Sequence, residues 1–543
     1  MVGSRLCEWW DALNATPVDS SRSRNRVAIL GFSLLGGCGF LAILLVTPHG
    51  AGVSSDSVYY LEGARNLAAG KGYSSDVTGV ATPVTHWPPF YSVTLAAVAI
   101  SGIDPWIVAR WLNASLMAAN IFLTGYCVLK QSHGSLLATA LAAILTVASP
   151  GLLWVHSMVW SEPLFIVLIL SALMCLINYI TSNRISALIG SACALSLALV
   201  TRYFALPIVA AAVIGIVLLP HAAWPRRIRD ALVFTALAFF PFCCFLVRNL
   251  LHAGQATDWV GFAEFQVSSV SLLSWVQTTL APVLQWCDSG TLSFWPRRGT
   301  QAAGCIGICG AAVILLHSVT VPHRQRRVYW QTLTCPLLAV ATYCAFFALS
   351  ACYVGLDMRF AVLRYSVPLQ PIIIVIAVTV TDRYIRHPLT RPKGIVVAAL
   401  SYATVAAASV VASYAWVINT RSDGQEYASS KWRTSPTLEF VKNITPEADV
   451  FSDGWDVVLH YTRRRAQPLP MFWDKFKERP AIHYRRDVDA LRKQLEVSDG
   501  FVVYLNELKR QRYYIVRPEE LSKDLRLDLV LKTDDGLVYH LRR

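Results

Sequence analysis

Charged side chains are scarce in this sequence, and the scarcity is confined to one part of it. Only 15% of the 543 residues are Asp, Glu, Lys or Arg, whereas 55% are hydrophobic. Of the 82 charged residues, 43 lie in residues 419–543, which leaves 39 for the first 418 residues. So little charge over so long a stretch excludes an ordinary soluble fold there and is typical of a membrane protein. The last part of the chain has the composition of a soluble domain.

Sequence motifs for metal, disulfide and nucleotide chemistry are also missing. The 13 cysteines include no CxxC pair and none lies in residues 419–543, so neither a cysteine metal site nor a disulfide framework is expected there. No Walker-type glycine-rich loop is present, which argues against an ATP-driven mechanism. Of the net charge of +14, +11 comes from the first 418 residues, in short clusters between apolar runs. That pattern sets membrane topology and does not indicate a nucleic-acid partner.

Apolar runs long enough to cross a bilayer predict about eleven membrane spans. They lie at about 27–47, 107–129, 135–150, 163–181, 185–201, 204–219, 231–247, 302–319, 331–352, 366–382 and 394–418. The first run follows Arg22, Arg24 and Arg26 and has no convincing cleavage site. It is therefore predicted to be a retained signal anchor with its N-terminal side in the cytoplasm.

The apolar run 88–102 decides the orientation of the later spans. If it does not cross, every basic loop that follows falls on the cytoplasmic side, as the positive-inside bias requires. Those loops carry Lys130, Arg184, Arg226, Arg227, Arg229, Arg324, Arg326, Arg327, Arg386, Arg391 and Lys393. If it crosses, all of them move outside. We therefore predict an interfacial or re-entrant helix at this run.

Three parts of the chain follow from this topology. Residues 1–26 form a cytoplasmic segment, residues 27–418 form the transmembrane domain with a first outer loop at 48–106, and residues 419–543 form an extracytoplasmic domain. In this last part, short β-rich runs alternate with helical patterns, which predicts a small α/β domain. The β-rich runs lie at 449–452, 500–505 and 528–531, and the helical patterns lie near 435–443, 487–496 and 518–523.

The same topology leaves no acidic residue near the bilayer midplane. Of the 14 carboxylates in the first 418 residues, five lie before the first span or beside cytoplasmic basic clusters, and nine lie in outer loops or at outer span ends. Ion-coupled transporters usually keep ionisable groups near the midplane, so this counts against a pump or symporter. It favours chemistry at the outer surface.

The first outer loop is the most informative segment. Residues 56–68 have an amphipathic pattern that ends at Gly70, which predicts a short helix with Asp56 near its N-terminus, just above the membrane. A second acidic position is Glu162, which opens a span ahead of Pro163. For both carboxylates the alternative is simple helix capping, which complements the helix dipole.

Arginine side chains also occur on the predicted outer side, against the topological bias. They are Arg202, Arg248, Arg359 and Arg364. Binding of phosphate by guanidinium groups supplies a reason for their position. Snorkelling towards lipid headgroups is the alternative.

Three sequence segments together resemble the GT-C superfamily of membrane glycosyltransferases. They are Asp56-x-x-Tyr59-Tyr60-Leu-x-x-Ala-Arg65-Asn66, a spacer that ends in Pro88-Pro89-x-Tyr91, and Ser161-Glu162-Pro163-Leu164-Phe165. More narrowly, they are similar to bacterial relatives of protein O-mannosyltransferases and of the aminoarabinose transferase of lipid A. The resemblance is strongest over 54–91 and 157–165. It implies a polytopic α-helical membrane protein of about eleven helices with a small extracytoplasmic α/β domain.

The resemblance also implies an inverting glycosyltransferase of the inner (plasma) membrane. It would move a sugar from a polyprenyl-phosphate donor to a glycan, lipid or protein acceptor on the outer face. Asp56 holds the place of the family's catalytic acidic residue and would act as general base, or help to place a divalent metal ion. Glu162 stands at a second acidic site where some relatives carry aspartate, which leaves metal binding open. The other candidates, all for substrate binding, are Tyr59, Tyr60, Arg65, His86, Arg202, Tyr203, Arg248, Arg359 and Arg364, of which the outer arginines would stabilise the leaving phosphate.

Two other functions are compatible with parts of this pattern. An envelope polysaccharide polymerase or ligase also works from lipid-linked sugars, but it would favour a large central outer loop. A transporter or flippase of envelope precursors would require ionisable residues or broken helices at the midplane, and few are found.

Overall fold

The computed structural model describes residues 21–78, 80–132, 134–219, 222–257, 323–354, 364–386, 391–474 and 479–542. The chain divides into two compact units. We call the first the helical unit; it comprises Met1–Pro48, Ala109–Arg248 and Phe265–Ser422. We call the second the mixed unit; it comprises His49–Val108, Asn249–Glu264 and Asp423–Arg543.

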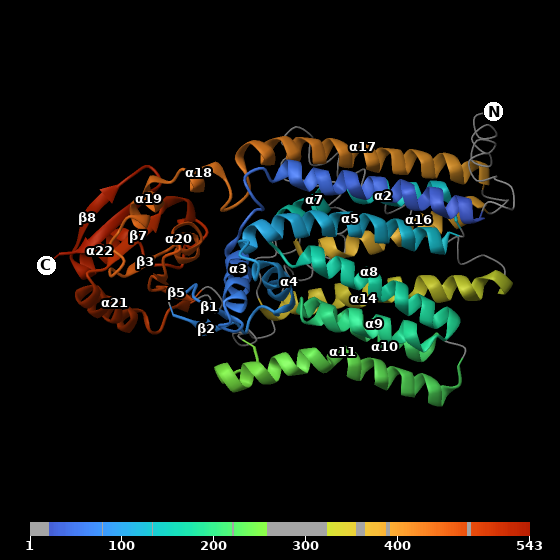
Figure 1. Cartoon of the computed structure of the whole chain (residues 1–543), viewed down its shortest axis with the longest axis horizontal. Coiled ribbons are helices and arrows are strands. Elements are labelled where there is room, and N and C mark those ends of the chain that lie inside the picture. The colour runs from blue at the N-terminus through green and yellow to red at the C-terminus, as the bar shows by residue number, and fades with distance from the viewer. Residues whose placement is uncertain are drawn as a thin grey trace. The chain divides into compact units, whose positions relative to one another are not determined.

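The helical unit is built from long apolar helices (Figure 1). Its elements, some of which extend past the unit's limits, are α2 (Ser21–Val46), α5 (Pro105–Gln131), α6 (Leu136–Val147), α7 (Pro150–Ser157), α8 (Glu162–Ser182), α9 (Ile185–Leu199), α10 (Leu206–Leu218), α11 (Trp224–Ala253), α14 (His323–Val354), α16 (Gln370–Arg386) and α17 (Arg391–Asp423). Short 3₁₀ turns at Tyr203–Ala205 and Val367–Leu369 precede α10 and α16.

A helix occupies each predicted span except 302–319, which lies outside the described residues. Six of the described helices are long and apolar enough to cross a membrane, and a bent pair would make a seventh. Helices α9 and α10 are shorter. The structure thus confirms a multi-pass membrane protein, while the number of eleven spans stays a prediction.

The bent pair is α6 and α7, and the bend lies where the predicted span 135–150 ends. The two helices meet at an angle of 53°. Ser149 caps α7 by accepting a hydrogen bond from the Leu152 amide at 3.3 Å, and Pro150 fills the first turn. Proline has no N–H to continue the helix before it, and its fixed φ suits a helix start. The Ser149 hydroxyl also donates to Gln370 Oε1 at 2.6 Å, which ties the break to α16.

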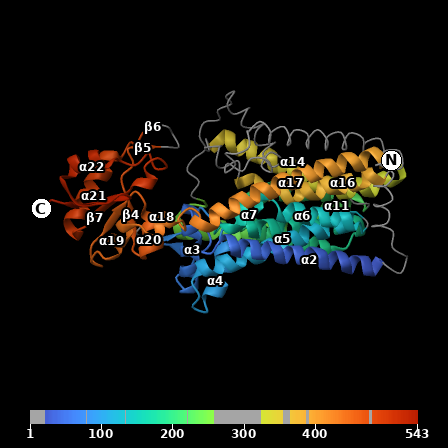
Figure 2. The same cartoon turned by 90° about the horizontal axis from the view of Figure 1, so that it is seen from above.

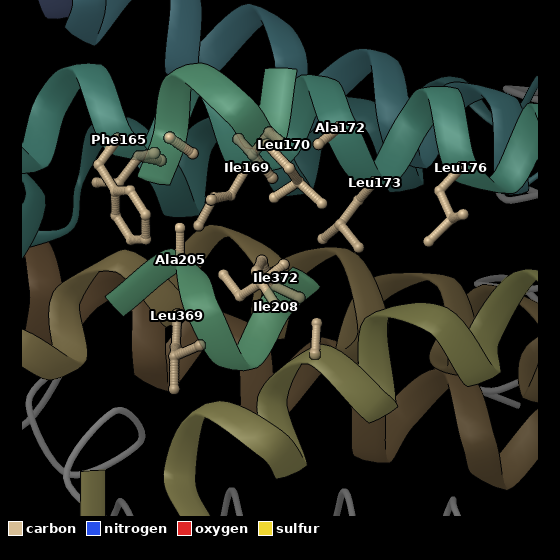
Figure 3. Close-up of a cluster of buried hydrophobic side chains, with 14 of the residues drawn as sticks. Phe165, Ile169, Leu170, Ala172, Leu173, Leu176, Ala205, Ile208, Leu369 and Ile372 are labelled. Carbon is tan, nitrogen blue, oxygen red and sulfur yellow. The ribbon is translucent and has the colours of Figure 1, made fainter. Parts of the chain in front are cut away.

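The centre of the helical unit is a cluster of apolar side chains on one face of α8. Phe165, Ile169 and Leu173 recur at intervals of four residues and are buried together with Ile208 of α10 and Ile372 of α16. Figure 3 shows these side chains pointing towards one another from the three segments. Lipid tails are as apolar as these residues, so van der Waals packing, rather than exclusion from water, holds such helices together. The packing fixes the start of α8, where Glu162 lies.

A five-stranded sheet forms the centre of the C-terminal part of the mixed unit. Its order is β4-β3-β7-β9-β8. Strands β4 and β7 run parallel to β3, whereas β9 runs antiparallel to β7 and to β8. The strands are β3 (Val450–Ser452), β4 (Ala466–Pro468), β7 (Phe501–Leu505), β8 (Leu527–Lys532) and β9 (Gly536–Leu541). The α/β fold expected for this segment is confirmed.

Helices cover both faces of this sheet (Figure 2). On one face, α21 (Tyr484–Ser498) and α22 (Pro518–Leu525) pack their leucines against alternate strand residues such as Val502. On the other face, α19 (Pro436–Lys442) and α20 (Trp455–Thr462) pack against each other and against β9 and β3. Successive strand residues point to opposite faces, so each strand serves both layers.

The remaining part of the mixed unit is the first outer loop, with helices α3 (Ser55–Ala68) and α4 (Phe90–Ala99). Helix α3 confirms the predicted helix at 56–68. The Ser92 hydroxyl of α4 donates to the Tyr60 carbonyl at 3.0 Å, so the two helices pack closely. Helix α4 has 10 residues and is about 15 Å long, half the thickness of a bilayer core. Its length agrees with the interpretation that the run 88–102 does not cross.

Candidate functional site

The predicted site residues are distributed over both units. The mixed unit contains Asp56, Tyr59, Tyr60, Arg65 and His86, and the helical unit contains Glu162, Arg202, Tyr203, Arg248 and Arg364. Arg359 lies outside the described residues.

Helix α3 positions Asp56 in its first turn. The helix begins with a capping box in which the Ser54 backbone amide donates to the Ser57 hydroxyl at 3.0 Å. The N-cap position therefore belongs to Ser54, and Asp56 is not the N-cap. The buried face of α3 includes Ser57 and Leu61, so that Asp56 and Tyr59 remain on its partly exposed side. Both side chains, one turn apart, lie where a ligand could reach them.

Aromatic rings extend this partly exposed surface. The Tyr59 ring stacks on Trp87 with centroids 4.1 Å apart, and the His86 ring meets Trp87 edge-on at 4.5 Å. Flat rings beside a carboxylate are a common lining of ligand sites, where apolar surface holds the ligand and a few polar groups orient it. Tyr60 differs from these residues, because it is only 2% exposed and its ring packs edge-on against Tyr91. In this conformation Tyr60 is a core residue.

Arg65 lies in a network of ion pairs within the mixed unit. Its guanidinium contacts Glu62 Oε1 at 2.6 Å and Asp104 Oδ1 at 3.0 Å. Asp104 is also bound by Arg463 at 3.0 Å. Burial raises the pKa of the Asp104 carboxyl, but the two guanidiniums outweigh burial and hold that pKa below its usual range. Arg65 thus fastens α3 to the start of α5.

Glu162 is the centre of a buried cluster in the helical unit. Its carboxylate is fully buried at the start of α8, and Oε2 lies 2.9 Å from Arg202 Nη1. Oε1 accepts a hydrogen bond from Arg364 Nε. The same Arg202 nitrogen donates to the Ser161 hydroxyl at 3.0 Å. Glu162 therefore does more than cap α8, because it holds two arginines that are 162 residues apart in the sequence.

Aromatic faces complete this cluster, which we call the arginine cluster (Glu162, Arg202, Arg364, Trp160 and Tyr365). The Arg364 guanidinium lies 3.9 Å from the centre of the Trp160 ring, and that of Arg202 lies 5.2 Å from the Tyr365 ring. Cation–π contacts of this kind are strongest where water is excluded. Two guanidiniums and one carboxylate leave the cluster with one net positive charge.

Two further candidates lie elsewhere on the helical unit. The Tyr203 ring meets Phe242 of α11 edge-on at 5.9 Å. Arg248 is half-buried near the C-terminal end of α11. Ion pairs join Glu162 to Arg202 and to Arg364, and these three residues form the candidate site of the helical unit.

Sequence reasoning missed the aromatic partners of the predicted polar residues. Trp87 follows His86, Trp160 precedes Ser161, and Tyr365 follows Arg364. Their position beside candidate residues was the only signal available, because ring contacts depend on the folded structure.

A metal site was left open by the sequence. Within the described ranges, no three His, Cys, Asp or Glu side chains come together in a way that could hold an ion. Both oxygens of the Glu162 carboxylate are already paired with guanidiniums. The donor set needed for a divalent cation is thus not found among the described residues.

Comparison with known proteins gives structural neighbours only. No protein-family model and no curated protein sequence matches the chain. Among solved structures, the chain is similar to ArnT from Cupriavidus metallidurans bound to undecaprenyl phosphate, with a TM-score of 0.61, 14% identity, and coverage of 93% of this chain and 97% of ArnT. It is also similar to the archaeal oligosaccharyltransferase AglB from Archaeoglobus fulgidus in complex with an inhibitory peptide and a dolichol-phosphate. There the TM-score is 0.54, the identity is 12%, and the match covers 94% of this chain and 74% of AglB.

Identities this low establish the fold alone. Both neighbours are GT-C membrane glycosyltransferases, and the match to each extends over nearly the whole of this chain. The resemblance indicated by the first outer loop and by the residues around Glu162 is therefore confirmed at the level of the fold. This chain has the fold of the GT-C superfamily of membrane glycosyltransferases.

Proposed function

We propose that this protein is an inverting glycosyltransferase that moves a sugar from a polyprenyl-phosphate donor to a hydroxyl group of a glycan, lipid or protein acceptor. The observation that carries the proposal is the arginine cluster, in which two guanidiniums share one buried carboxylate. It is supported by the structural neighbours, which were solved with undecaprenyl phosphate and with a dolichol-phosphate.

The charge of the arginine cluster suits the leaving group of this reaction. The donor phosphate is a diester with one negative charge, and it leaves as a monoester that gains a second one. Arg202 and Arg364 would stabilise this developing charge, because the two guanidiniums outnumber the one carboxylate of the cluster. Arginine is suited to this role because its planar guanidinium binds phosphate oxygens in pairs.

Asp56 would act as the general base. Its carboxylate removes the proton of the acceptor hydroxyl, the acceptor oxygen forms a bond to the anomeric carbon, and the bond from that carbon to the phosphate oxygen breaks on the opposite side. One displacement of this kind inverts the anomeric configuration. Tyr59, Trp87 and His86 form the adjoining surface on which a sugar ring can rest.

The proposed mechanism assigns a positioning role to three of the candidate residues, Glu162, Arg65 and Tyr60. Glu162 sets the separation of Arg202 and Arg364, and a carboxylate already shared by two guanidiniums does not need to contact the sugar. Arg65 is bound by two carboxylates, and Tyr60 is buried beneath α4.

We further propose that the protein lies in the inner (plasma) membrane with its N-terminus in the cytoplasm and its C-terminal domain outside. At the end of α8 opposite Glu162, Arg226 donates to the Asn183 carbonyl at 3.0 Å. Elsewhere, Arg383 donates to the Gln131 carbonyl at 3.0 Å, which joins the ends of α16 and α5. Helix α8 has 21 residues and spans about 30 Å, one bilayer core. Basic residues at the C-terminal end of α8 suit the cytoplasmic side of the membrane. The N-terminal end of α8, with the arginine cluster, then lies at the outer side.

The direct test is sugar transfer by the purified full-length protein from a panel of synthetic polyprenyl-phosphate sugars. We expect the wild type to use at least one donor, and Asp56→Asn to lower the transfer rate by about 10²–10⁴-fold, the usual contribution of a general base. Asp489→Asn, the same change on the exposed surface of α21, is the matched control and should transfer at the wild-type rate.

Two results would contradict the proposal. If Asp56→Asn transfers as fast as the wild type, Asp56 is not the base. If a folded wild type transfers no sugar but moves lipid-linked sugars across vesicles, the protein is a flippase.

A further inference from the structure

Helix α20 of the C-terminal domain lies against helix α3 of the first outer loop. The two helices pack side by side within the mixed unit, although some 400 residues separate them in sequence. Two polar contacts mark their alignment. Asp456 is hydrogen-bonded by the Ser55 side chain, and Arg463 Nη1 lies 3.7 Å from Glu62 Oε1.

The spacing of these contacts shows that the helices run parallel. Ser55 and Glu62 are seven residues apart on α3, and Asp456 and Arg463 are seven residues apart along α20 and its C-cap. Seven residues are about two helical turns, or roughly 10 Å. The first contact lies at the first turn of both helices, and the second lies two turns further along both.

Asp456 is held rigidly at the first of these contacts. It is fully buried, and its two oxygens lie 2.7 and 2.8 Å from Arg512 Nη2. The Tyr427 hydroxyl donates to the same carboxylate at 3.0 Å. Burial raises the pKa of Asp456, but Arg512 outweighs burial and keeps that pKa below its usual range. The group that receives Ser55 is therefore a fixed carboxylate.

The second contact joins α20 to both ends of the loop. Arg463 Nη2 lies 3.0 Å from Asp104, which in turn binds Arg65 of α3. One turn before it, His460 packs edge-on against Trp106 at 5.0 Å. The indole nitrogen of Trp106 donates to the Ala51 carbonyl at 2.7 Å, just ahead of α3.

The geometry points to a positioning role for α20 in catalysis: Asp456 and Arg463 brace α3 and so fix Asp56, the residue next to Ser55. This inference rests on the proposed function, and it deepens it, because it makes the C-terminal domain part of the scaffold of the catalytic base. A base displaced by about 1 Å loses on the order of 10²-fold in rate, so a brace on its helix is of direct consequence.

Arg463→Gln is the variant that tests the brace. Its side chain is 46% exposed, so the chain should still fold. Loss of Asp456 would instead leave Arg512 buried and unpaired, which is strongly destabilising. Arg486→Gln is the matched control, because Arg486 lies on α21 with its side chain 73% exposed.

Two quantities are measured on each full-length variant: hydrogen exchange of the α3 amides against those of α21, and the kcat and KM of transfer. For Arg463→Gln we expect exchange in α3 to be faster by about tenfold and kcat to fall by about tenfold or more, with KM for the donor within about twofold and α21 unchanged. Arg463→Lys, which keeps the charge, should recover most of both losses. Arg486→Gln should match the wild type.

Each other outcome overturns the inference. If α3 exchanges as slowly in Arg463→Gln as in the wild type, no brace exists. If α3 loosens while kcat is unchanged, the contact stabilises the loop without positioning the base. If the wild type itself transfers no sugar, the proposed function fails and the positioning role fails with it, while the exchange data still report whether α20 holds α3.

Discussion

At the scale of single residues, buried acidic groups of the C-terminal domain differ in their ionisation because their neighbours differ. Asp456 faces the Arg512 guanidinium at 2.7 Å and has a lowered pKa. Asp453 lies three residues earlier; burial raises its pKa to about 7, and contact with the Leu505 amide only partly offsets burial. A paired carboxylate and a poorly paired one thus occur within one turn of chain.

The raised pKa of Asp453 makes the stability of the mixed unit depend on pH. A folded pKa above that of the unfolded chain means that the protonated form is favoured by folding. This group's contribution is complete below about pH 4 and is lost as the pH rises towards 7.

Asp453→Asn should remove that dependence, since asparagine keeps an acceptor for the Leu505 amide but stays neutral. We expect the variant to be more stable than the wild type at pH 8, by up to about 4 kcal/mol, and the difference to shrink towards pH 4. Hydrogen exchange of the β7 amides, compared between the two proteins at each pH, measures it. A difference that is the same at every pH would show that Asp453 does not titrate in this range.

Candidate residues could be predicted where their local position in the sequence is unusual, whereas their distant partners could not. Asp56, Glu162 and Arg202 were predicted as candidates because they lie in outer loops or at span ends. Asp456 and Arg512 do not, because a soluble domain contains many charged residues and only folding selects the two that are buried. The ion pair of Arg463 with Asp104 joins positions 359 residues apart.

At the scale of secondary-structure elements, apolar periodicity predicted the long helices better than the short one that follows a bend. The predicted span 135–150 covers α6 and ends at Pro150, where the chain bends by 53°, and it does not include the rest of α7. The apolar pattern continues through the bend, so only the pair Ser149-Pro150 marked it. The hydrogen bond from Ser149 to Gln370, which holds the bend, is a contact between helices and leaves no trace in either sequence segment.

Two arginines near helix α16 have different surroundings. Arg364, six residues before the helix begins, is nearly buried against Glu162 and Trp160. Arg386, at the C-terminal end, pairs with Asp382 at 2.9 Å with its side chain 43% exposed. If charge alone matters for donor binding, lysine should replace either arginine equally well.

We expect Arg364→Lys to lower sugar transfer by at least about tenfold, because lysine keeps the charge but loses the planar fork and the stacking on Trp160. Arg386→Lys, the same change at the C-terminal end of α16, should leave transfer within about twofold of the wild type. Initial rates at saturating donor measure both. Equal rates for Arg364→Lys and the wild type would remove Arg364 from the phosphate site.

At the scale of the whole molecule, the two structural units do not coincide with the two parts that composition distinguishes. Composition separates an apolar part from a charged C-terminal part, and the structure contains a helical membrane unit and a C-terminal α/β fold that correspond to them. The mixed unit, however, contains the first outer loop as well as the tail. Local sequence patterns carry no information about this pairing, because the contacts that form it are between side chains hundreds of residues apart, such as Arg465 with Asp76 at 2.9 Å.

The proposed reaction is a single displacement at the anomeric carbon of a polyprenyl-phosphate sugar. The measurement that tests it most directly is the anomeric configuration of the product, determined by NMR after the purified wild type has transferred sugar from a donor of one defined anomer. We expect a product with the opposite configuration, because Asp56 activates the acceptor and forms no bond to the sugar. A product that keeps the donor's configuration would contradict it, since that outcome requires two displacements and a covalent sugar–enzyme intermediate.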